Sequence, residues 1–123
     1  MLTTTSFSEL VHAKKEINAL KVKKPTVFKQ FVHIIHLTRQ MQFKFQYMGS
    51  LIMDEDPSAF RPIIKDDYVL TVYQQEIAKL KSNSKATELK QLLADHQSMG
   101  YATLSDLVLG VSPEVLVGPA VVR

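Results

Sequence analysis

Two histidines separated by two residues, His33 and His36, are the first side chains in this 123-residue sequence that could carry chemistry. Residues at positions i and i+3 share one face of a helix, so both imidazole rings could reach one metal ion. Zinc needs at least a third protein ligand, and no glutamate follows His33 as it does in a His-Glu-x-x-His site. His12 and His96 belong to other segments, and their approach cannot be read from the sequence. We therefore expect no metal site and interpret the pair as partly exposed histidines on a polar helix face.

Other residue types that carry catalysis or bind metals are missing or unsuitably spaced. The chain contains no cysteine, which excludes a thiol nucleophile, a disulfide framework and a thiolate metal site. Asp54, Glu55 and Asp56 form an acidic cluster, but Pro57 follows it in place of the alternating ligands of a calcium loop. No phosphate-binding glycine loop or nucleophile elbow occurs. We expect a non-catalytic protein without a cofactor, and the alternative left open is an enzyme with a histidine-centred site.

Lysine is concentrated in the first half of the chain. Residues 1–50 carry eight Lys or Arg and two Glu, a net charge of +6. Residues 51–123 carry seven Lys or Arg and ten Asp or Glu, a net charge of −3. Such asymmetry is typical of a protein with one surface for an anionic partner and another for a different contact. The alternative is that charges fall unevenly in a short chain without a functional reason.

One group of polar side chains lies at helical spacing. Lys29, His33, His36 and Gln40 step by four, three and four residues, so they line one stripe of a helix, which Phe43 and Tyr47 would prolong. Lysines neutralise phosphates and aromatic rings stack on bases, so this combination suits RNA or single-stranded DNA. The alternative is a solvated helix face whose aromatic residues belong to the core. The predicted nucleic-acid-binding residues are Lys14, Lys15, Lys21, Lys23, Lys24, Lys29, His33, His36, Arg39, Lys44 and Tyr47.

Capping residues and proline predict the first two helices. A capping box at residues 6–9 should begin one helix, and Pro25 should stop it. Thr26 should cap a second helix that reaches toward Met53. Residues 41–47 alternate apolar and polar side chains as strands do, but no second alternating run could pair with them, so we favour helix. The predicted buried faces are Leu10, Ala13, Ile17 and Leu20, then Phe28, Phe31, Val32 and Ile35.

Three or four shorter helices should follow a loop over 54–62. Asp66 should cap a third helix, and the polar break at 82–84 should end it. A fourth helix is predicted over about 85–99, and a fifth over 103–110 with its first residue, a threonine, as the cap. Pro113 suits the first position of one more turn. The predicted inner faces are Val69, Tyr73, Ile77 and Leu80, then Leu89, Leu92, Leu93 and His96.

These segments predict an all-α fold, a small bundle of about five helices in one domain over 1–123, with 1–5 and 119–123 as flexible tails. No apolar stretch approaches the roughly 20 residues of a membrane helix, and the N-terminus lacks a signal-peptide pattern, so we expect a cytoplasmic protein. In size, helicity and basic first half, the chain resembles the small subunits of multi-subunit CRISPR effector complexes. That family has no short diagnostic motif, so the resemblance assigns no role to any residue. It implies repeated copies along a guide RNA in antiviral defence, with non-catalytic support of RNA and single-stranded DNA.

The expected partners are therefore nucleic acid and other protein subunits, with no membrane contact. The alternative is a protein-binding adaptor or regulator of phage or plasmid type, without nucleic-acid contact. Such an adaptor would meet its partner through the seam of Leu10, Ala13, Ile17 and Leu20 and through the apolar residues 115–122. Binding that weakens steeply with salt would favour the first hypothesis, and self-association unaffected by RNA would favour the second.

Overall fold

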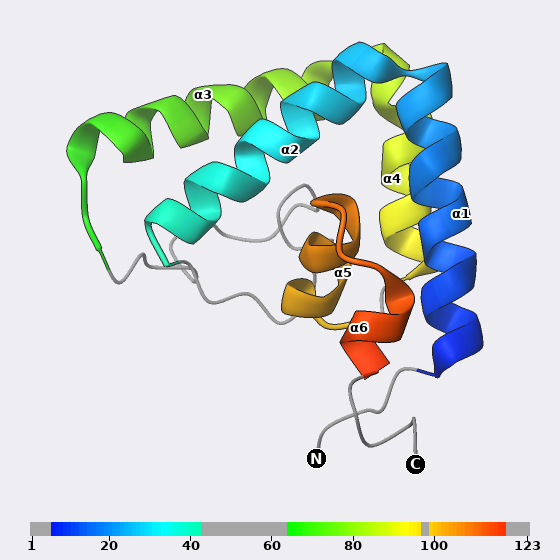
Figure 1. Cartoon of the computed structure of the whole chain (residues 1–123). Helices are drawn as coiled ribbons and strands as arrows, with labels where there is room; N and C mark the ends of the chain where they lie inside the picture. Colours follow the sequence, from blue (N-terminus) through cyan, green and yellow to red (C-terminus); the bar gives the residue numbers. More distant parts are fainter. Residues whose placement is uncertain (1–5, 43–63, 97–98, 118–123) are drawn as a thin grey trace.

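A computed structural model describes residues 6–42, 64–96 and 99–117 of the chain. The described residues form six α-helices and one short 3₁₀-helix and contain no strand, which confirms the predicted all-α fold. The predicted tails and most of the ambiguous segment at 41–47 lie outside the described residues. The elements, shown in Figure 1, are α1 (Phe7–Lys23), α2 (Pro25–Gln40), α3 (Asp67–Ser82), η3 (Ser84–Ala86), α4 (Thr87–Asp95), α5 (Tyr101–Val108) and α6 (Pro113–Val117).

Helix α1 begins at the predicted cap. The Ser6 hydroxyl accepts a hydrogen bond from the Glu9 backbone N–H at 3.2 Å and donates one to Glu9 Oε1 at 3.1 Å. The cap satisfies one of the backbone N–H groups that have no partner in the first turn of a helix. The predicted seam of Leu10, Ala13, Ile17 and Leu20 is buried in the main core. That seam is therefore not a surface for a partner, and this part of the adaptor hypothesis is wrong, because the chain's own helices cover it.

Helix α2 starts two residues earlier than expected and ends much earlier. Pro25 takes the first helical position, where its missing N–H costs nothing, so Thr26 lies inside the helix and its predicted role as a cap is wrong. The predicted continuation toward Met53 is also wrong, because α2 ends at Gln40. Gln42 adopts a left-handed φ of 54°, which a right-handed helix cannot contain. The Met41 carbonyl then accepts a hydrogen bond from the Ile64 N–H at 3.1 Å.

Helices α3 and α4 follow the sequence pattern at their starts and inner faces. The Asp66 side chain accepts hydrogen bonds from the N–H groups of Tyr68 and Val69, as its predicted capping role requires. The break at 82–84 leads through η3 into α4, which is shorter than predicted because it ends at Asp95. Every predicted inward residue of the two helices is buried or half-buried, namely Val69, Tyr73, Ile77, Leu80, Leu89, Leu92, Leu93 and His96.

Helices α5 and α6 complete the core. Gly100 is the N-cap of α5, so Thr103 lies inside that helix and its predicted capping role is wrong. Gly110 has a φ of 107°, a conformation that glycine adopts at no steric cost, and the turn there ends α5 close to the predicted position. Pro113 opens α6 as predicted.

Helix α1 packs against four other helices, α2, α4, α5 and α6. Helix α3 lies alongside α2 (Figure 1). The outer side of α2 and the corner where α1 turns into α2 are thus left at the surface. Within the described ranges, none of the helices has both the length and the apolar character needed to cross a bilayer.

Candidate functional site

The predicted polar stripe of α2 lies at the surface. Lys29, His33, His36 and Gln40 are all exposed, whereas Phe31, Ile34 and Ile35 on the opposite side of the helix are buried. Only His33 of the four has a charged neighbour among the described residues, because its Nδ1 lies 3.8 Å from Glu76 Oε1 on α3. We call Lys29, His33, His36 and Gln40 the outer stripe.

Three further lysines lie where α1 turns into α2. Lys21 and Lys23 are in the last turn of α1, and Lys24 is the single residue between the two helices. The Lys21 ammonium lies 5.9 Å from the centroid of the Phe28 ring near the start of α2. We call Lys21, Lys23 and Lys24 the basic corner.

Acidic residues are missing from this part of the chain. The sequence contains no Asp or Glu from Ile17 to Met53. The first turn of α2 has no acidic residue, and no side chain caps it. The positive end of the α2 dipole therefore adds to the positive potential of the neighbouring lysines instead of being offset by a carboxylate. The basic corner and the outer stripe follow one another from the end of α1 along α2, with Glu76 of α3 beside His33 and with Glu16 and Glu88 in a pocket that Lys23 also lines.

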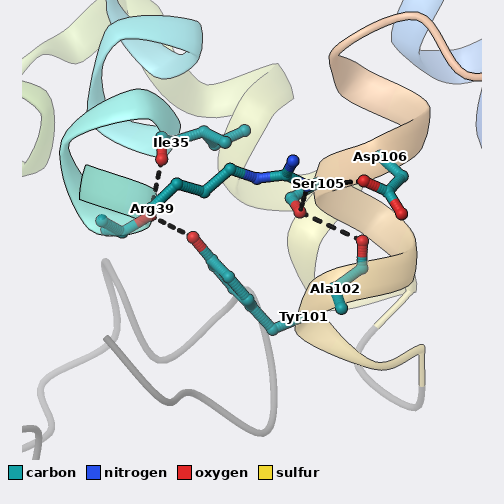
Figure 2. Close-up of polar contacts among 7 residues, drawn as sticks. Ile35, Arg39, Tyr101, Ala102, Ser105 and Asp106 are labelled. Carbon is teal, nitrogen blue, oxygen red and sulfur yellow. Dashed lines mark hydrogen bonds and ion pairs between the residues drawn. The ribbon is translucent and has the colours of Figure 1, made fainter. Parts of the chain in front are cut away.

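Two of the predicted nucleic-acid-binding residues are used inside the fold. The Lys14 ammonium donates a hydrogen bond to the Leu107 carbonyl near the end of α5 at 3.0 Å, a position that favours a cation. Arg39 donates to Ser105 Oγ at 2.7 Å and to Asp106 Oδ1 at 2.5 Å (Figure 2). These two cations hold α1 and α2 to α5, so we remove them from the candidate surface.

The other predicted residues divide into two groups. Lys15 is exposed on the outer side of α1, away from the buried seam, and makes no ion pair with a described residue. Lys44 and Tyr47 lie outside the described residues. The candidate nucleic-acid surface therefore consists of the basic corner, the outer stripe and Lys15.

A buried polar contact beside Arg39 also joins α2 to α5 (Figure 2). The Thr38 hydroxyl donates to the Ile35 carbonyl at 2.7 Å and accepts a hydrogen bond from the Tyr101 hydroxyl. Burial raises the pKa of the Tyr101 hydroxyl above its ordinary value, while Thr38 and Arg39 oppose this shift. Burial likewise raises the pKa of Tyr73 on α3, with a further contribution from Tyr101. No local sequence pattern indicated the contact between Thr38 and Tyr101, because these residues are 63 positions apart.

The structure brings together a second group of residues that the sequence did not predict. Glu16 Oε1 lies 2.8 Å from His12 Nε2 and 2.9 Å from His96 Nε2. His12 and Glu16 are one turn apart on α1, and His96 is the residue that follows α4. The i, i+4 spacing of His12 and Glu16 is a readable signal, but the approach of His96 depends on how α4 packs against α1.

Two of the three side chains, His12 and His96, line an open pocket between the start of α1 and the end of α4. Its volume is about 310 Å³, and its other lining residues are Ser8, Glu9, Asp95 and Met99. Among the residues that the structure describes, this is the only cluster of three His, Cys, Asp or Glu side chains able to hold one metal ion. His33 and His36 do not belong to any such cluster.

The candidate nucleic-acid surface thus has the charge to hold a phosphate backbone, and the histidine cluster has the donor atoms to hold a cation. Comparison of the chain with protein-family models, with curated protein sequences and with solved structures found no match.

Proposed function

We propose that the chain acts in the cytoplasm as a non-catalytic subunit that binds the backbone of RNA or single-stranded DNA within a larger ribonucleoprotein assembly, such as a CRISPR effector complex. The observation that carries this proposal is the grouping of four lysines, those of the basic corner and Lys29, at the α1–α2 turn and the start of α2. It comes from a part of the sequence without a single carboxylate between Ile17 and Met53. A surface of this kind favours a polyanion over a neutral or cationic partner.

The charges on this surface suit phosphate contacts. Lys21 and Lys23 end α1, Lys24 is the one residue between the helices, and Lys29 lies in the second turn of α2. The imidazoles of His33 and His36 and the Gln40 amide add hydrogen-bonding groups along the same face of α2. Lysine neutralises a phosphate as a point charge without reading bases, so the expected binding tolerates many sequences.

The remainder of the described chain has the opposite balance. Residues 64–117 carry five Lys and seven Asp or Glu, a net charge of −2. This acidic part would be repelled by a phosphate backbone and is free to meet basic protein neighbours. The two surfaces together support an assembly subunit that lies between a nucleic acid and other proteins.

The salt dependence of binding tests the proposal. Each single-stranded phosphate contact contributes a slope of about 0.7 to the plot of log affinity against log salt, so four contacts predict a slope of about −3. Fluorescence anisotropy with a labelled 20-nucleotide RNA should therefore show roughly fiftyfold weaker binding at 200 mM than at 50 mM salt. Single-stranded DNA and scrambled sequences should behave alike.

Two results would contradict the proposal. One is the absence of binding at 50 mM salt, and the other is an affinity that does not change across the salt range. Sedimentation of the protein with and without RNA distinguishes this proposal from the adaptor hypothesis. Self-association that RNA leaves unchanged would favour the adaptor.

A further inference from the structure

We propose that His12, Glu16 and His96 form a binding site for one Zn²⁺ ion, with the fourth coordination position open to the pocket beside them. This site rests on different residues from those of the nucleic-acid surface, so the two proposals can fail independently. The ligand set is two imidazoles and one carboxylate, which zinc accepts in sites that keep an open position.

Two of the three distances between the donor atoms are close to those of a zinc site. Ligands about 2.1 Å from one tetrahedral zinc ion lie roughly 3.3 Å from each other. The two imidazole nitrogens lie 2.8 and 2.9 Å from the same carboxylate oxygen, and all three atoms lie within 4.8 Å of one another. Rotation of the exposed His12 side chain and of the half-buried Glu16 would bring the three donor atoms around a common ion.

The burial of the three side chains suits a metal bound at the edge of the core. The His96 side chain is only 8 % exposed, Glu16 is 28 % exposed and His12 is 68 % exposed. A buried imidazole directed at a carboxylate is an anchor whose position is fixed by packing, since neighbouring residues restrict its rotamers. His12 lies on the open side and can close over an ion after it enters.

The surroundings leave room for the fourth ligand. The pocket of about 310 Å³ is large enough for water or a small anion next to the ion. Asp95 and Glu9 line the same pocket and provide carboxylates that can orient a zinc-bound water or the ligating imidazoles. The ion would also join α1, which contributes two ligands, to His96, the residue that follows α4.

Zinc binding to the untagged full-length chain tests this site. Competition with a chromophoric zinc chelator should show one Zn²⁺ per chain. The His12→Ala variant removes a ligand that is mostly exposed and so leaves the core intact, which circular dichroism verifies. Loss of a group that only orients a ligand costs tenfold to a hundredfold in affinity, so loss of the ligand itself should weaken zinc binding by at least about a hundredfold.

The matched control is His33→Ala, which removes an exposed histidine that also lies near a glutamate of another helix. This control should leave zinc affinity unchanged, and Glu16→Gln should weaken it as His12→Ala does. Substitution with Co²⁺ should give the intense visible absorption of a tetrahedral site, lost in His12→Ala. The proposal is overturned if the chain takes up no zinc, or if His12→Ala and His33→Ala reduce its affinity equally.

Discussion

Arg39 and Lys29 are two cations on the same helix, and the structure gives them different surroundings. Arg39 lies at the α2–α5 contact, where Ser105 and Asp106 accept hydrogen bonds from its guanidinium. Lys29 lies ten residues earlier on the outer stripe and makes no ion pair with a described residue. The guanidinium serves the fold, whereas the ammonium group is available to a partner.

This difference shows that the net charge of a segment overestimates the number of cations that a partner can reach. Lys14 and Arg39 both contribute to the net charge of +6 in residues 1–50, yet both bond to groups on α5. The cations that remain available are grouped more tightly, at the basic corner and along the outer stripe. Substitutions in the two regions should therefore separate stability from binding.

The largest expected effect is a loss of stability when a side chain on the buried side of α2 is shortened, compared with the same change on its exposed side. Phe31 is 1 % exposed, and Phe31→Ala should lower the free energy of unfolding by about 3–5 kcal/mol because it leaves a cavity in the main core. His36→Ala on the outer stripe should change it by less than about 0.5 kcal/mol. Urea denaturation of both variants measures the difference. Similar losses for the two would contradict the placement of these faces.

Alkaline pH should weaken the side of α2 that faces α3 and α5. Tyr73 and Tyr101 have raised pKa values in the folded state, against an ordinary value of 10.0. Above pH 10 the unfolded chain loses these protons while the folded chain keeps them. The contribution of the two tyrosines to the free energy of unfolding is therefore complete below pH 10 and is lost as pH rises. Each tyrosine contributes up to about 1.4 kcal/mol per pH unit.

Urea denaturation between pH 9 and pH 11 measures this loss. Tyr101→Phe should make the decline less steep, since the variant has no hydroxyl to ionise at that position. A decline equally steep in the variant would show that Tyr101 is not the group responsible.

Arg39→Gln should show the structural use of a cation. Its side chain is 42 % exposed and that of Asp106 is 34 % exposed, so water screens the pair and the loss should be only about 1 kcal/mol. Asp106→Asn should cost a similar amount, and the double variant should cost less than the sum. RNA affinity should fall less than twofold. A fall in RNA affinity well beyond twofold would indicate that Arg39 contacts the nucleic acid.

Lys29→Ala should weaken RNA binding and leave the free energy of unfolding almost unchanged, the opposite of Arg39→Gln. The free energy of unfolding should change by less than about 0.5 kcal/mol, since no described residue pairs with this lysine. The slope of log affinity against log salt should become about 0.7 smaller in magnitude. Anisotropy titrations at four salt concentrations measure the slope. An unchanged slope would mean that Lys29 does not contact a phosphate.

The sequence predicted the buried faces of the helices well, because apolar residues at helical spacing must turn toward a common core. Residues such as Leu10, Ile17 and Leu89 are buried as expected. Helix ends were predicted less well, since the stop of α2 at Gln40 accompanies a left-handed residue at Gln42 and a bond from Ile64 that periodicity cannot show.

The candidate sites show the same limit. The outer stripe could be predicted because its residues are neighbours on one helix. The pairing of Arg39 with Asp106 and the approach of His96 to Glu16 depend on contacts across 67 and 80 residues. Such contacts are set by how helices pack, and a single sequence does not encode them in any local spacing.

The most direct test of the account is a comparison of two triple variants with equal loss of charge. One variant changes Lys21, Lys23 and Lys29 to glutamine at the α1–α2 surface, and the other changes Lys65, Lys85 and Lys90 to glutamine in the acidic part. RNA affinity of each is measured by anisotropy at the same salt concentration. We predict that the first variant loses at least about tenfold more affinity than the second, because phosphate contacts are local. Equal losses would show that net charge alone attracts the nucleic acid and would contradict a defined surface on α1 and α2.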